Sequence, residues 1–126
     1  MDNIYSVLVV DDSTTNRKFL HYILDEEGYQ VWEAPSGEAC LAMVQERRPM
    51  LILLDVVMGG IDGFETLKRL KADPAFAWTP VIMLTSMDDQ QSKIKTFELG
   101  AVDYIVKSAN PAEIKARIRV HIRLSM

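Results

Sequence analysis

Four short apolar runs stand out along the chain, and each is followed by a polar side chain with reactive chemistry. The runs are Val7–Val10, Met50–Leu54, Val81–Leu84 and Tyr104–Val106. Each is too short for a typical helix and is bounded by polar residues, which predicts strands; a further strand is predicted over Gln30–Ala34. The run Met50–Leu54 is apolar at every position, so we expect a central parallel strand with helices on both of its faces.

Segments with apolar residues at helical spacing alternate with these strands. The first predicted helix covers Thr14–Glu27 and stops at Gly28, and the fourth has Ile94 and Phe97 as its apolar members and stops at Gly100. The predicted N-caps of the second to fifth helices are, in order, Ser36, Asp62, Asp88 or Asp89, and Asn110. The chain therefore reads as five strand–helix units.

Five such units with right-handed crossovers favour a doubly wound, three-layer α/β fold, because they are too few for an eight-stranded barrel. We expect a flavodoxin-like (βα)5 sheet with parallel strand order 2-1-3-4-5, in which the first and third strands are neighbours at the point of reversal. Residues 1–126 form one predicted domain. The last helix has no Gly or Pro stop before Met126, so the domain could be cut from a longer protein.

Composition narrows the class of protein. The chain is 48% hydrophobic and 25% charged, with a net charge of -4, which is typical of a soluble domain and argues against direct binding of nucleic acid or an anionic membrane. Basic residues do gather in the last helix, where a solvated face is the simpler interpretation and a local partner surface the alternative. That group comprises Lys115, Arg117, Arg119, His121 and Arg123.

Cysteine content and hydropathy predict the location. Cys40 is the single cysteine, so no internal disulfide can form, and we interpret it as a core residue in a reducing compartment. The sequence has no signal-like start and no apolar run of about 18 residues. A soluble, cytoplasmic protein without a membrane span is expected.

The polar residues after the strands predict a reactive site. Asp11, Asp12, Asp55, Thr85 and Lys107 should converge, because the carboxyl ends of parallel strands share one edge of the sheet. Three carboxylates together call for a hard divalent cation, Mg²⁺ or Mn²⁺ in its place, and such a cation leaves positions for phosphate oxygens. Asp55 ends the most buried strand and is the best nucleophile, with Lys107 and Thr85 placed to contact phosphoryl oxygens.

The acidic pair Asp11-Asp12, followed by Asp55, Thr85, Tyr104 and Lys107, resembles the receiver domain of two-component response regulators over nearly the whole chain. The resemblance implies that Asp55 accepts a phosphoryl group from a phosphohistidine on a histidine kinase or histidine phosphotransfer protein. It also implies that Asp12, Asp55 and the backbone carbonyl of Val57 hold Mg²⁺, while Asp11 orients a metal-bound water.

The same resemblance implies a switch and not an enzyme with turnover. Thr85 would bond a phosphoryl oxygen, Tyr104 would rotate inward, and the face of the fourth helix, fifth strand and fifth helix would repack to signal to a downstream effector. The sequence leaves open whether the domain also forms a homodimer through its last helix. Activity would be limited to self-phosphorylation and slow self-dephosphorylation.

Some positions depart from the family's commoner pattern. Gly59 replaces a proline, which predicts a more flexible loop after Asp55. Ser108 also replaces a proline, and we expect a trans bond before it because cis would cost about 2.5–4 kcal/mol. Ser86 replaces a smaller residue, and Val57 and Met87 add apolar bulk near the path of a hydrolytic water, which predicts slow dephosphorylation.

Three alternatives remain at this point. A haloacid-dehalogenase-like phosphotransferase would need a second acid two residues after its nucleophile, where this chain has Val57. A flavodoxin-like electron carrier is disfavoured because Asp11 and Asp12 would repel a flavin phosphate. A receiver-like interaction module that is not phosphorylated is the third. His21 and His121 are expected to be surface residues, and Met58, Met83 and Met87 packing or loop residues.

Overall fold

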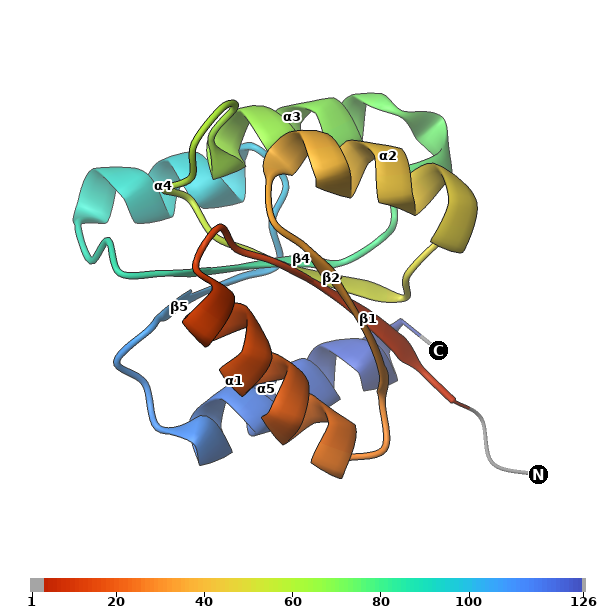
Figure 1. Ribbon diagram of the computed structural model, residues 1–126. Coiled ribbons are helices and arrows are strands. Elements are labelled where there is room, and N and C mark those ends of the chain that lie inside the picture. Colours follow the sequence, from red (N-terminus) through yellow and green to blue (C-terminus); the bar gives the residue numbers. More distant parts are fainter. Residues whose placement is uncertain (1–3, 126) are drawn as a thin grey trace.

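The computed structural model describes residues 4–125, and residues 1–3 and 126 of the predicted domain lie outside the described part. Five parallel strands form one sheet in the order β2-β1-β3-β4-β5, which confirms the predicted doubly wound topology (Figure 1). The strands are β1 (Ser6–Val10), β2 (Gln30–Ala34), β3 (Leu51–Leu54), β4 (Val81–Thr85) and β5 (Asp103–Val106). β3 is central and buried throughout, as its apolar sequence predicts.

Helices cover both faces of the sheet. They are α1 (Thr14–Glu26), α2 (Gly37–Arg47), α3 (Gly63–Ala72), α4 (Gln90–Glu98) and α5 (Pro111–Leu124), with a short 3₁₀ helix η1 (Pro74–Phe76) before β4. Figure 1 shows α1 and α5 on one face and α2, α3 and α4 on the other. Alternate residues of each strand therefore enter two separate cores, with Leu8 and Ile52 facing α2 and α3 while Val9 and Leu53 face α1 and α5.

Local sequence signals fix where the helices begin and end. The side chains of Ser36, Asp62 and Asp89 each accept a hydrogen bond from a backbone N–H in the first turn of their helix, and Asn110 does so for α5. Gly28, with φ of +90°, and Gly100, with φ of +104°, take the left-handed conformation after α1 and α4. These caps confirm the predicted boundaries to within a residue or two, and Asp89, not Asp88, begins α4.

The two large apolar residues of the predicted fourth helix, Ile94 and Phe97, do not enter the core. Both side chains of α4 are about half exposed, at 47% and 50%. The helix instead buries Ser92 and Thr96, and the hydroxyl of Thr96 has no hydrogen-bond partner among the described residues. α4 therefore packs on the sheet through small polar side chains and turns its large apolar ones outward.

Candidate functional site

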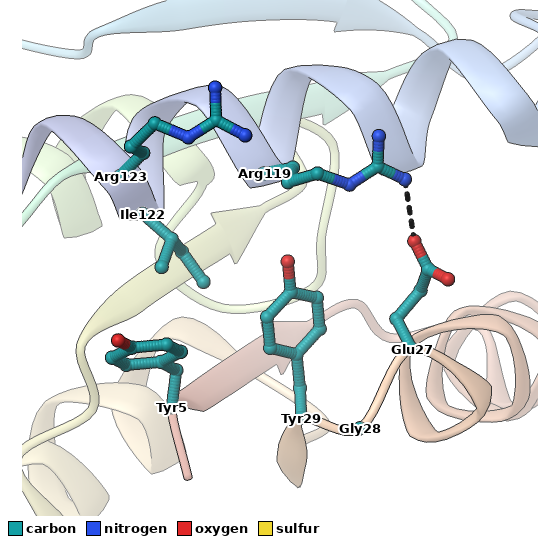
Figure 2. A pocket seen from close by; sticks show the side chains of 7 residues that line it. All are labelled: Tyr5, Glu27, Gly28, Tyr29, Arg119, Ile122 and Arg123. Atoms are coloured by element: carbon teal, nitrogen blue, oxygen red, sulfur yellow. Dashed lines mark hydrogen bonds and ion pairs between the residues drawn. The ribbon is translucent and has the colours of Figure 1, made fainter. Parts of the chain in front are cut away.

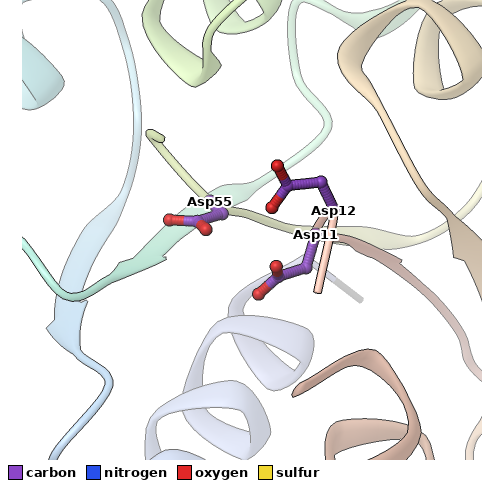
Figure 3. A group of neighbouring side chains, drawn as sticks. All are labelled: Asp11, Asp12 and Asp55. Carbon is purple, nitrogen blue, oxygen red and sulfur yellow. The ribbon is translucent and has the colours of Figure 1, made fainter. Parts of the chain in front are cut away.

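The site lies at the carboxyl edge of the sheet, where β1 and β3 run side by side. Val10 pairs with Leu54, and the backbone N–H of Asp55 donates to the carbonyl of Val10 at 3.0 Å. This register places the residues after both strands next to one another. Carboxylate oxygens of Asp11, Asp12 and Asp55 all lie within 4.8 Å of one another, as expected from the sequence (Figure 3).

Lys107 reaches the same point from the end of β5. Its backbone N–H donates to the carbonyl of Thr85 at 2.8 Å, which fixes the loop, and its Nζ lies 2.7 Å from Asp11 Oδ2 and 2.9 Å from Asp55 Oδ2. Burial acts to lower the pKa of Lys107, but the hydrogen bonds and charges of the two aspartates outweigh it and raise that pKa above its usual value. The ammonium group therefore stays charged and balances two buried carboxylates.

The three acids differ in exposure and in their backbone contacts. Asp11 and Asp55 are almost fully buried, at 2% and 5%, whereas Asp12 is exposed. Asp11 accepts from the N–H of Ser13 at 2.8 Å, and Asp12 accepts from the N–H of Gly59 at 3.3 Å. The oxygen of Asp55 that does not contact Lys107, Oδ1, accepts from the N–H of Val57 at a long 3.4 Å.

Thr85 and Tyr104 lie beside this cluster and share a partner. The buried Thr85 hydroxyl accepts from the N–H of Met87 at 3.4 Å, and the hydroxyl of Tyr104 donates to the carbonyl of Met87. Burial, and then the negative charges of Asp89, Asp88 and Asp55, raise the pKa of Tyr104 above its usual value. Tyr104 is 8% exposed, so it already lies inward in this structure as a neutral hydrogen-bond donor, and its rotation on switching stays a prediction.

The three clustered carboxylates fit a hard divalent cation. They offer only oxygen ligands, two of them belong to buried side chains, and one side of the cluster reaches solvent through Asp12. The predicted carbonyl ligand, Val57, belongs to an exposed residue of the loop between β3 and α3. Its role stays a prediction, while the acids by themselves are compatible with Mg²⁺.

Comparison with known proteins identifies the family. The model of the response regulator receiver domain matches residues 7–119. This chain belongs to the response regulator receiver domain family. The match decides against the haloacid-dehalogenase and flavodoxin alternatives, and it confirms the predicted resemblance.

Individual relatives agree with this assignment. The receiver domain is 37% identical over 118 residues to the phosphate regulon transcriptional regulatory protein PhoB of Pseudomonas aeruginosa, covering 94% of this chain and 52% of PhoB. It superposes on a putative response regulator from Chloroflexus aurantiacus with a TM-score of 0.92 at 35% identity, covering 96% and 99% of the two chains. It superposes on chemotaxis protein CheY4 of Vibrio cholerae with a TM-score of 0.89 at 31% identity, covering 94% of this chain and 98% of CheY4. The chain spans about half the length of the first curated relatives.

The receiver domain also contains residues that sequence reasoning missed. Arg17 of α1 donates from one terminal nitrogen to the carbonyl of Asp11 at 2.8 Å, and its Nε pairs with Glu33 of β2 at 3.2 Å. Lys18 and His21 contact the same Glu33 carboxylate, at 3.1 and 2.6 Å. The sequence around Arg17 gives no local signal for this contact, because its partner Glu33 lies 16 residues away.

The expectation that both histidines are surface residues is wrong for His121. Its side chain is 17% exposed, and Nε2 lies 3.1 Å from Asp103 Oδ2. Arg117 pairs with the other oxygen of Asp103 at 2.8 Å, and Arg119 pairs with Glu27 at 2.8 Å. Much of the basic run in α5 is thus engaged in ion pairs within the chain. His21 is partly buried as well, because it packs against Glu33.

The backbone and the hydropathy of the helices bear on two further expectations. The described residues contain no cis peptide bond, so the bond before Ser108 is trans, as expected. No helix within residues 4–125 combines the length and apolar character that a membrane crossing requires. A pocket of about 530 Å³ lies at the amino edge of the sheet, opposite the acids, and Arg119 and Glu27 close one side of it (Figure 2).

Proposed function

We propose that this receiver domain is a phosphoryl-accepting switch of a two-component phosphorelay and that Asp55 is the phosphoacceptor. The observation that carries the proposal is the joint contact of Lys107 with Asp11 and Asp55 at the point where three carboxylates meet. A partly buried ammonium group beside a carboxylate supplies a ready contact for phosphoryl oxygens. The donor would be a phosphohistidine on a histidine kinase or histidine phosphotransfer protein.

The transfer requires no further reactant besides water. One oxygen of Asp55 attacks the phosphorus and forms an acyl phosphate, while the P–N bond of the phosphohistidine breaks and its electron pair stays on the imidazole nitrogen, which takes a proton from water. Asp12, Asp55 and the carbonyl of Val57 would hold Mg²⁺, with Asp11 acting through a water. When bound, the cation neutralises charge that develops on the phosphoryl oxygens.

The residues around Asp55 then respond to the added charge. A phosphoryl group brings about -1.5 to -2 charges and three acceptor oxygens. Lys107 exchanges its contact with the Asp55 carboxylate for a phosphoryl oxygen, and the Thr85 hydroxyl donates to another. Because Thr85 and Tyr104 both bind Met87, a shift of Thr85 moves the loop before α4 and frees the hydroxyl of Tyr104.

The signal would leave through α4, β5 and α5. α4, which follows the loop that contains Met87, presents Ile94 and Phe97 on its exposed side, and α5 presents Val120 and Leu124. We infer a downstream effector domain or protein that reads this face, or a homodimer through α5. We infer a switch without enzymatic turnover. The cytoplasmic location expected from the sequence stays a prediction. Slow dephosphorylation, caused by the apolar bulk of Val57 and Met87 near the path of the hydrolytic water, also stays a prediction.

The proposal is tested by incubating the protein with acetyl phosphate and Mg²⁺ and measuring its intact mass. The expected result is a gain of one phosphoryl group that Asp55→Asn abolishes. Asp88→Asn is the matched control, because Asp88 lies on the rim of the site and pairs with Lys93 at 2.7 Å. A wild-type protein that gains no phosphoryl group would favour the unphosphorylated interaction module instead.

A further inference from the structure

The loop between β3 and α3 follows the proposed phosphoacceptor directly and contains two successive glycines. Gly60 takes the left-handed conformation, with φ of +75°, and Gly59 has open space around its Cα. Glycine gives a chain more conformational freedom than any other residue. Contacts from elsewhere must therefore hold this loop, and with it Val57, in one conformation.

Glu38, in the first turn of α2, supplies one such contact from outside the acid cluster. Its Oε2 accepts a hydrogen bond from the backbone N–H of Ile61 at 3.2 Å. The carboxylate also lies against Gly60, since a Cβ built there would be 2.5 Å from Oε2 and 2.8 Å from Oε1. Glu38 therefore holds Ile61 by a backbone hydrogen bond and packs against the neighbouring Gly60.

The start of α2 packs tightly on the same loop and on α3. A Cβ at Gly37 would lie 2.1 Å from the hydroxyl of Thr66 and 2.7 Å from Cγ1 of Ile61. Gly37 thus allows the backbone of α2 to approach closely enough for Glu38 to reach the loop. On its other side the loop is held by Asp12, which accepts from the N–H of Gly59.

We propose that Glu38 is a positioning residue for the magnesium site, because it holds the glycine-containing loop that carries Val57. This inference rests on the proposed function, since Val57 as a carbonyl ligand is part of it. Glu38 lies outside the three clustered acids, so its contact with the loop does not compete with cation binding. A loop that is held in advance loses less conformational entropy when its carbonyl binds a cation.

The test compares Glu38→Ala with Glu38→Gln and with Glu46→Ala, which removes an exposed acid from the last turn of the same helix. Titration calorimetry with Mg²⁺ alone is expected to show about a tenfold higher Kd for Glu38→Ala. Glu38→Gln should stay within about twofold of the wild type, because its amide oxygen accepts the same hydrogen bond. Glu46→Ala should resemble the wild type.

A second measurement needs no cation. Hydrogen exchange of the Ile61 amide should accelerate in Glu38→Ala and stay slow in Glu38→Gln and Glu46→Ala. Equal loss of Mg²⁺ affinity in both Glu38 variants would overturn the proposal in favour of a simple charge effect. An unchanged Mg²⁺ affinity in Glu38→Ala would also overturn it. If the wild type binds no Mg²⁺, the proposed function fails, and unchanged protection of Ile61 in Glu38→Ala then overturns the role of Glu38 separately.

Discussion

Thr85 and Tyr104 hold the two backbone polar groups of one residue. Thr85 Oγ1 accepts the N–H of Met87 at 3.4 Å, and the Tyr104 hydroxyl donates to the carbonyl of Met87. The two side chains come from neighbouring strands, β4 and β5, whose register pairs Thr85 with Val106. The loop before α4 is therefore the physical link between the acid cluster and the proposed output face.

Removing the Tyr104 hydroxyl should loosen this loop. Tyr104→Phe is expected to lower the free energy of unfolding by about 0.5–1.5 kcal/mol, because the carbonyl of Met87 loses its hydrogen bond. Amide exchange in residues 86–89 should accelerate, as measured by mass spectrometry. Tyr22→Phe is the control, since Tyr22 is 63% exposed, and equal protection of the loop in Tyr104→Phe would contradict the link.

Lys107 and a bound cation should compete for the same carboxylates. Lys107→Met is expected to bind Mg²⁺ about tenfold more tightly, because the ammonium charge no longer neutralises Asp11 and Asp55. The same variant should gain a phosphoryl group from acetyl phosphate more slowly. Calorimetry measures the Mg²⁺ affinity, and intact mass measures the rate of phosphoryl gain. Lys68→Met, on the exposed side of α3, is the control. Weaker Mg²⁺ binding by Lys107→Met would contradict this competition.

The ion pairs of Glu33 predict a pH-dependent contribution to stability. Burial acts to raise the pKa of Glu33, but hydrogen bonds from His21, Lys18 and Arg17 outweigh it and hold that pKa below its ordinary value. A carboxylate with a lowered folded-state pKa stabilises the protein above its unfolded pKa, and this stabilisation is lost as the pH falls through the folded value.

Urea unfolding of Glu33→Gln tests this contribution. At about pH 7 the variant should be less stable than the wild type by about 1 kcal/mol, and the difference should shrink as the pH falls through the folded-state pKa of Glu33. Glu46→Gln should show no such pH-dependent difference, because Glu46 is exposed. A difference for Glu33→Gln that persists unchanged at low pH would contradict the assigned cause.

Two fully buried threonines should respond oppositely to the same substitution. The Thr66 hydroxyl donates to the carbonyl of Asp62 at 2.8 Å, whereas that of Thr96 has no partner among the described residues. Thr96→Val is expected to raise the free energy of unfolding by about 1 kcal/mol, and Thr66→Val to lower it by about as much. Chemical denaturation measures both, and a destabilised Thr96→Val would show that its hydroxyl is in fact satisfied.

Strand topology and the acid cluster could be predicted from the sequence because both follow from local rules. Apolar runs mark the buried strands, and the carboxyl ends of parallel strands meet at one edge, so Asp11, Asp12 and Asp55 had to converge once the order was right. Lys107 joined them because its strand ends at the same edge. The caps at Ser36, Asp62 and Asn110 are equally local signals.

The features that sequence reasoning missed depend on contacts between distant segments. Ile94 and Phe97 are the large apolar members of α4, yet both are about half exposed, and Ser92 and Thr96 take the buried positions of the helix. Glu38 reads as an ordinary acid in a helical first turn, and only the fold brings it to Ile61, 23 residues away.

The central claim is that Asp55 carries the phosphoryl group, and the most direct measurement locates that group on the chain. After reaction with acetyl phosphate and Mg²⁺, borohydride reduction converts an aspartyl phosphate to homoserine, which tandem mass spectrometry of peptides places at one residue. Homoserine is expected at position 55 alone. Homoserine at position 11 or 12, or unmodified residues throughout, would contradict the claim.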